Sequence, residues 1–177
     1  MECIRIILTM ITNEEKLRLE SLYQSLLKDE RILKMKKYRI HRGSNCYYHT
    51  FKVTKKAMNC ALHKKNVNME NLLYACVLHD YYLYSRKGDP GRKKGHVKKH
   101  PVIAKENAIK DFHINDEVAL AIETHMWPLN FSKFPKTKEA RLLSHYDTWV
   151  ATLEFLVSKK YKEKHQAKDE EYISKLF

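Results

Sequence analysis

The sequence is poor in the residues that build turns, with only four glycines and four prolines among 177 residues. This scarcity argues against a turn-rich β-sandwich and favours packed helices. Long apolar runs are also lacking. The first ten residues, MECIRIILTM, have neither the basic start nor the small-residue cleavage site of an export signal, and they are too short to cross a bilayer. We therefore expect a cytoplasmic protein that does not bind a membrane.

Cysteine is scarce as well, with four residues and no C-x-x-C pair. This spacing does not suit a zinc knuckle. Cys60 and Cys76 lie among apolar neighbours, which is typical of small buried side chains. We expect free thiols in a reducing compartment and assign them no chemistry.

Apolar residues make up 44% of the sequence and charged residues 31%, and the length suits one domain spanning residues 1–177. The predicted fold class is all-α, a compact helical bundle. Its core covers about 41–157, preceded by N-terminal helices in 1–40 and followed by a charged C-terminal extension, 158–177, whose end can dock back. Helical periodicity indicates segments near 12–27, 46–63, 68–80, 101–110, 116–125 and 137–154.

Positive charge dominates, with 34 Lys and Arg against 21 Asp and Glu, a formal net charge of +13. Such a field attracts anions, either a small phosphorylated substrate or nucleic acid. The irregular segment 85–100 concentrates this charge and could form a cationic lid over a phosphate or a merely solvated loop. Its predicted substrate-binding residues are Arg92, Lys93, Lys94 and Lys99.

Several histidines and acids fall on inward faces or buried ends of the predicted helices. An unpaired imidazole or carboxylate in such a place destabilises the fold by several kcal/mol, and a shared metal cation removes that penalty. Nitrogen and oxygen ligands without cysteine favour a catalytic site over a structural zinc site. Asp80 is the candidate bridge between two ions, because a carboxylate has two oxygens. The other residues of this set are His49, His79, His125 and Asp147.

The order of these residues, His49 followed by His79-Asp80 and then Asp147, resembles the H…HD…D signature of the HD-domain superfamily over about 41–157. The resemblance implies a helical bundle and a phosphohydrolase or phosphodiesterase acting on nucleotides. Cyclic dinucleotide cleavage is not expected, because Leu83 stands where that branch has a lysine, and no GYP motif is present.

Two further histidines, His100 and His125, resemble those that hold the second metal in the binuclear branch of the superfamily. The stretches HVKKHP at 96–101 and HMWPL at 125–129 resemble small bacterial HD-domain proteins of no stated substrate. His96 is an alternative ligand to His100, which we favour for its place before a predicted helix.

The resemblance thus implies two divalent ions, chosen from Mn, Fe, Zn, Co or Ni. The expected ligands are His49, His79 and Asp147 for one ion and His100 and His125 for the other, with Asp80 shared. A hydroxide between the ions would attack phosphorus. Asp80 and His96 are the predicted catalytic residues, His96 as the acid for the leaving oxygen.

Two other functions stay open from the sequence. The basic surface also suits a nucleic-acid-binding module, although that does not explain inward-facing acids. A metal-loaded but inactive nucleotide sensor is the second alternative. Aromatic residues near the predicted ligands can either wall a base-stacking pocket or belong to the core, namely Tyr47, Tyr48, Tyr81, Tyr82, Tyr84, Trp127 and Trp149.

Overall fold

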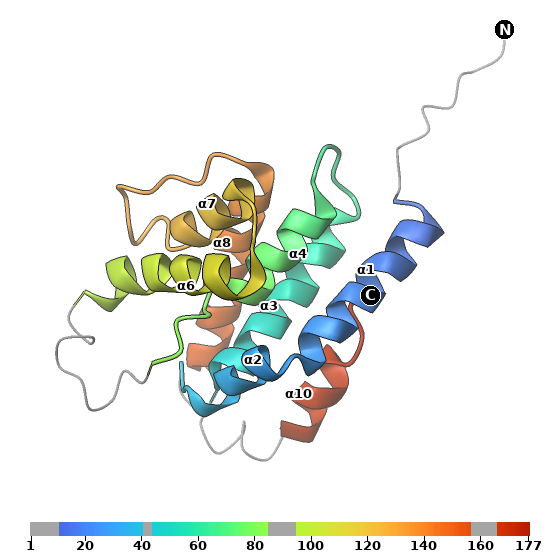
Figure 1. The fold of residues 1–177 in the computed structure, drawn as a ribbon, viewed down its shortest axis with the longest axis horizontal. Helices are drawn as coiled ribbons and strands as arrows, with labels where there is room; N and C mark the ends of the chain where they lie inside the picture. Colours follow the sequence, from blue (N-terminus) through green and yellow to red (C-terminus); the bar gives the residue numbers. More distant parts are fainter. Residues whose placement is uncertain (1–10, 41–43, 85–94, 157–165) are drawn as a thin grey trace, which may run out of the picture.

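The fold is given by a computed structural model that describes residues 11–40, 44–84, 95–156 and 166–177 (Figure 1). Within these ranges the chain forms helices and one isolated bridge between Arg39 and Asn45, so the predicted all-α class is confirmed. The helices are α1 (Asn13–Lys28), α2 (Glu30–Leu33), α3 (Cys46–Ala61), α4 (Met69–Leu78), α6 (His96–Phe112), α7 (Asp116–Thr124), α8 (Lys138–Leu156) and α10 (Gln166–Ile173), with a 3₁₀ turn η1 at Lys34–Lys37.

Side-chain caps mark the starts of several helices, among them α1, α3, α4 and α7. Thr12 and Glu15 form a reciprocal capping box at the start of α1. The side chains of Asn45, Asn68 and Asn115 accept hydrogen bonds from backbone N–H groups three residues later, at the starts of α3, α4 and α7. Each cap stabilises its helix by about 1 kcal/mol and satisfies donors that have no partner inside the helix.

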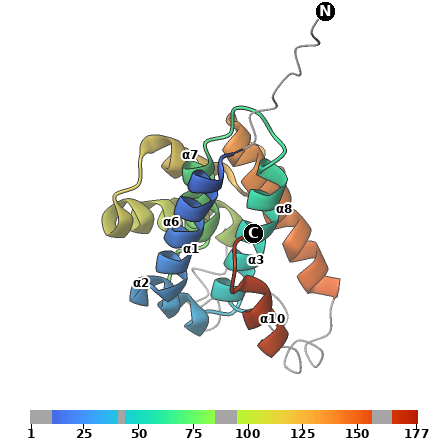
Figure 2. The same ribbon diagram turned by 90° about the vertical axis from the view of Figure 1, so that its right-hand side faces the viewer.

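Helix α4 occupies the middle of the bundle and contacts α1, α3, α7 and α8. From Leu72 to Leu78 its residues are apolar on every side, and Leu72, Leu73 and Val77 are fully buried. A helix of this kind is stable only when other helices surround it. Figures 1 and 2 show α6 and α7 on one side of the bundle and α1 and α10 on the other.

Five of the aromatic side chains considered as walls of a pocket belong instead to the core. They are less than 6% exposed and comprise Tyr47, Tyr48, Tyr81, Tyr82 and Tyr84. Trp149, by contrast, is 53% exposed. None of the helices in the described ranges combines the length and hydrophobicity needed to span a bilayer.

The C-terminal end packs against the bundle, with α10 on α3 and with Ile173 and Leu176 buried. The buried Tyr23 on α1 donates a hydrogen bond through its hydroxyl to the carbonyl oxygen of Ile173, at 2.6 Å. This end of the extension is therefore part of the folded domain.

Replacing Tyr23 by Phe should lower the free energy of unfolding by about 1–2 kcal/mol, because the carbonyl of Ile173 then loses its buried partner. Urea denaturation measures the change. Tyr172→Phe is the matched control, since Tyr172 is 38% exposed, and we expect it to change stability by less than about 0.5 kcal/mol. Equal effects of the two substitutions would contradict the role given to Tyr23.

Candidate metal centre

The structure brings all six predicted metal ligands together in one buried group, which we name the His/Asp cluster. Their donor atoms form three overlapping sets, and within each set the atoms lie no more than 4.8 Å apart. All six residues are buried. The cluster joins five parts of the chain: α3 (His49), the end of α4 (His79, Asp80), α6 (His100), the end of α7 (His125) and α8 (Asp147).

Backbone carbonyls fix the orientation of three imidazoles in the cluster. The oxygens of Cys76, Ile122 and His96 lie 2.8, 2.7 and 2.7 Å from the Nδ1 atoms of His79, His125 and His100. A carbonyl oxygen can only accept, so each Nδ1 carries the hydrogen. In the neutral ring, Nε2 then holds a lone pair, and all three lone pairs belong to the interior of the cluster. This is the tautomer that a metal ligand requires.

His100 and His125 approach each other with their Nε2 atoms 3.0 Å apart. Burial, together with the neighbouring His96, lowers the pKa of His100 to about 3. Burial and His100 likewise lower the pKa of His125 to about 3. Both rings are therefore neutral at pH 7, and two lone pairs face each other without a proton between them. A cation that accepts both lone pairs removes this repulsion.

His79 presents a second unsatisfied nitrogen. Its Nε2 is buried and has no hydrogen-bond partner among the described residues. The nearest carboxylate oxygens are Oδ2 of Asp80 at 3.5 Å and Oδ1 of Asp147 at 3.6 Å. Burial opposes a charge on His79, but Asp80 and Asp147 outweigh burial and raise its pKa, so this nitrogen favours a bound cation, either a proton or a metal ion.

His49 lies between two carboxylates. Its Nδ1 donates to Oε2 of Glu154 at 3.0 Å, and its Nε2 lies 3.0 Å from Oδ1 of Asp147. Burial lowers the pKa of His49, but the hydrogen bonds with Asp147 and Glu154 outweigh burial and raise it to about 10. Burial acts against ionisation of Asp147, yet His49 and His79 hold its pKa well below the usual range. In the metal-free protein, a proton on Nε2 therefore occupies the position that a metal would take.

Glu154 is a functional candidate that the sequence analysis did not select. It is 5% exposed, and its Oε1 accepts a hydrogen bond from the hydroxyl of Ser44 at 2.9 Å. Lys52 lies 3.5 Å from the same oxygen and 2.7 Å from Asp169 on α10. Glu154 could have been selected from the sequence by its position seven residues after Asp147, because this spacing places both acids on one face of α8.

The start of α6 differs from the sequence prediction, because the helix begins at His96 rather than Pro101. Backbone N–H groups of Lys98 and Lys99 bond to the carbonyl of Gly95, which adds more than one turn before the proline. Pro101 has no N–H, so α6 forgoes one backbone hydrogen bond at that position. His100 consequently lies inside the helix rather than ahead of it.

His96 lies beside the cluster but outside its three sets of donor atoms. Its ring stacks on that of His100 with centroids 4.4 Å apart, and its Nδ1 is 2.8 Å from the hydroxyl of Tyr84. The geometry thus favours His100 over His96 as the ligand. Lys99 is exposed on α6. The remaining predicted substrate-binding residues, Arg92, Lys93 and Lys94, lie outside the described residues.

Metal affinity should depend on pH differently at the two ends of the cluster. An ion bound by His49 displaces a proton, so its affinity should rise about tenfold per pH unit as the pH rises towards 10, the pKa of His49. An ion bound by His100 and His125 displaces no proton from these rings above about pH 4, so its affinity should not change with pH in this range. Competition titrations at pH 6, 7 and 8 on the His100→Ala/His125→Ala and His49→Ala variants isolate the two ends. Equal pH slopes would contradict this difference.

The fold and the cluster together define an all-helical protein with a buried group of histidines and aspartates that can hold a metal ion. Comparison with models of known protein families, with curated proteins and with solved structures gave no match. The assignment of a function therefore depends on the geometry and on the sequence pattern.

Proposed function

We propose that this protein is a metal-dependent phosphohydrolase whose His/Asp cluster holds two divalent transition-metal ions. The observation that carries the proposal is the convergence of imidazole Nε2 atoms whose rings are held in the metal-binding tautomer by backbone carbonyls. The clearest part is the contact of 3.0 Å between Nε2 of His100 and Nε2 of His125, because two neutral rings in this tautomer bring two lone pairs together. The resemblance to the H…HD…D signature supports the same reading.

Asp80 has the position expected of a bridging ligand. Its Oδ2 faces His79 at 3.5 Å, whereas its Oδ1 faces His100 at 3.5 Å. One ion would be held by His49, His79 and Asp147 and the other by His100 and His125, with Asp80 shared between them. When bound, the ions would supply positive charge for a phosphoryl group and an activated water molecule.

The chain's own groups would complete the reaction. His96 is held against Tyr84 and His100, which orients its ring at the edge of the cluster, and in the proposal it protonates the leaving oxygen. Lys99, with Arg92, Lys93 and Lys94, would bind the substrate phosphate. The proposed substrate is a phosphate ester, with nucleotides as the class that the sequence resemblance favours.

Metal content measured by mass spectrometry, beside phosphate release from a panel of nucleotides with Mn²⁺, tests this function. Two ions per chain are expected, falling to one in the His100→Ala/His125→Ala variant together with loss of turnover. His63→Ala, on an exposed histidine, is the matched control and should retain both ions. Failure to bind metal after reconstitution would refute the proposal. Full metal loading without turnover on any substrate would favour the nucleotide sensor instead.

A further inference from the structure

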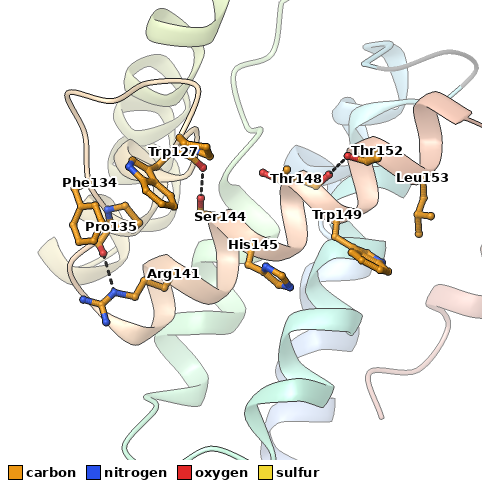
Figure 3. A pocket seen from close by; sticks show the side chains of 11 residues that line it. Trp127, Phe134, Pro135, Arg141, Ser144, His145, Thr148, Trp149, Thr152 and Leu153 are labelled. Atoms are coloured by element: carbon orange, nitrogen blue, oxygen red, sulfur yellow. Dashed lines mark hydrogen bonds between the residues drawn. The ribbon is translucent and has the colours of Figure 1, made fainter.

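A cavity of about 660 Å³ lies along the outer face of α8, beside the segment that follows α7 (Figure 3). Aromatic rings form much of its wall, with Trp127 and Phe134 near the start of α8 and Trp149 further along. The rings of Trp127 and Phe134 meet edge to face, with centroids 5.4 Å apart. None of the six residues of the His/Asp cluster lines this cavity. It is therefore a site separate from the candidate metal centre.

Large apolar side chains remain exposed around this cavity. Phe134 is 50% exposed, Trp149 53% and Leu153 44%. Apolar groups gathered in a concave surface mark a binding site rather than ordinary surface, because their exposure to water is unfavourable. The wall is held in place by the hydroxyl of Ser144, which donates to the carbonyl oxygen of Trp127 at 2.6 Å.

A second cavity, of about 650 Å³, adjoins the first and shares Arg141 and His145 with it. Its lining adds Lys64, Lys65 and Lys138. None of the described residues that line either cavity is acidic. The two cavities together offer aromatic surfaces on one side and basic side chains on the other.

Arg141 lies where the two cavities meet. Its Nε donates to the carbonyl oxygen of Pro135 at 3.2 Å, and its guanidinium carbon is 5.7 Å from the centroid of the Phe134 ring. These contacts hold a cation at the edge of the aromatic wall. A ligand that fills both cavities must therefore carry an aromatic ring system next to an anionic group.

We propose that this surface binds a nucleotide unit, with the base against Trp127 and Phe134 and the phosphate on Arg141 and Lys64. Bases stack on aromatic side chains regardless of their identity, and arginine pairs with phosphate through two parallel hydrogen bonds. The volume of the aromatic cavity falls within the range of small-molecule sites. This site is independent of the proposed hydrolase activity, because it shares no residue with the His/Asp cluster.

Tryptophan fluorescence can report on this site directly, because both tryptophans of the protein line the aromatic cavity. We expect AMP to quench the emission in the presence of EDTA, when no metal is bound. Adenosine and inorganic phosphate should each bind at least about tenfold more weakly, since each fills only one of the two cavities. Loss of quenching in EDTA, or equal binding of adenosine and AMP, would overturn the proposal.

Two charge reversals locate the phosphate. Arg141→Glu and Lys64→Glu should each raise the dissociation constant of AMP by about tenfold. Lys64 is exposed, and among the described residues no side-chain hydrogen bond is found for it, so its result stands if Arg141→Glu fails to fold. Lys110→Glu, an exposed lysine on α6, makes the same change in net charge and should leave binding unaltered. Equal effects of Lys64→Glu and Lys110→Glu would refute the assignment.

A comparison of AMP with an oligonucleotide distinguishes a free nucleotide from a nucleotide within a single strand. A short oligoadenylate that binds more tightly than AMP assigns the site to a single strand, and equal affinity assigns it to the free nucleotide. Light scattering measures the molar mass in solution and so tests whether a second copy of the chain covers this apolar surface. A dimer that Trp149→Asp dissociates would overturn the nucleotide proposal.

Discussion

Substitution of Asp80 by Asn should reduce phosphate release by about a thousandfold while leaving the protein folded. The two carboxylate oxygens of Asp80 lie 3.5 Å from Nε2 of His79 and 3.5 Å from Nε2 of His100. An asparagine side chain has one oxygen and no charge, so it can serve only one of these positions. Initial rates with Mn²⁺ and a nucleotide substrate measure the loss, and metal analysis should find no more than one ion per chain.

Asp116→Asn is the matched control for this substitution. Asp116 is exposed in the first turn of α7, so the same chemical change there should leave rate and metal content unaltered. Circular dichroism of both variants should show the wild-type helical spectrum. An Asp80→Asn protein with wild-type turnover would exclude Asp80 as the bridging ligand.

Replacing Glu154 by Gln should weaken metal binding by about 10- to 100-fold, with little change in the shape of the core. The carboxylate accepts the Nδ1 hydrogen of His49 at 3.0 Å, and its negative charge makes the opposite nitrogen a stronger ligand. Glutamine keeps an acceptor oxygen but not the charge. Competition with a coloured chelator gives the dissociation constant, and it does so whether or not the protein turns over a substrate.

The salt bridge between Lys52 and Asp169 provides the control for Glu154. Asp169→Asn disturbs the same lysine but does not touch His49, so it should alter metal affinity less than about threefold. A similar loss in both variants would show that Glu154 acts through the charge network. A loss in Glu154→Gln alone supports its role as the residue that positions His49.

The helices and the residues of the His/Asp cluster could be predicted because their signals are local. Asn45, Asn68 and Asn115 fix helix starts through bonds to residues three positions away, and the apolar periodicity determines which face is buried. Asp147 was recognisable as an acid in an otherwise apolar stripe. A small bundle has one core, so polar residues on the inward faces of separate helices come together there. Their convergence could therefore be predicted from the pattern.

The features that escaped prediction depend on distances between helices. Glu154 lies on the same face of α8 as Asp147, but only the packing of α3 against α8 shows that it contacts His49. The start of α6 at His96 also eluded the sequence, because Pro101 is a stronger local signal for a first turn than Gly95. The aromatic cavity forms because residues 126–137 pass beside α8. The periodicity of the sequence does not predict the course of this segment.

The packing of α10 on α3 has a consequence for biosynthesis. The ribosome makes α10 after all the other described helices, yet α10 supplies Asp169 to Lys52, next to the carboxylate that orients His49. Until α10 emerges, Lys52 lacks one of its two acidic partners. The six residues of the His/Asp cluster and Glu154 all precede α10 in the chain, so the Lys52–Asp169 pair is the last part of this charge network to form during synthesis.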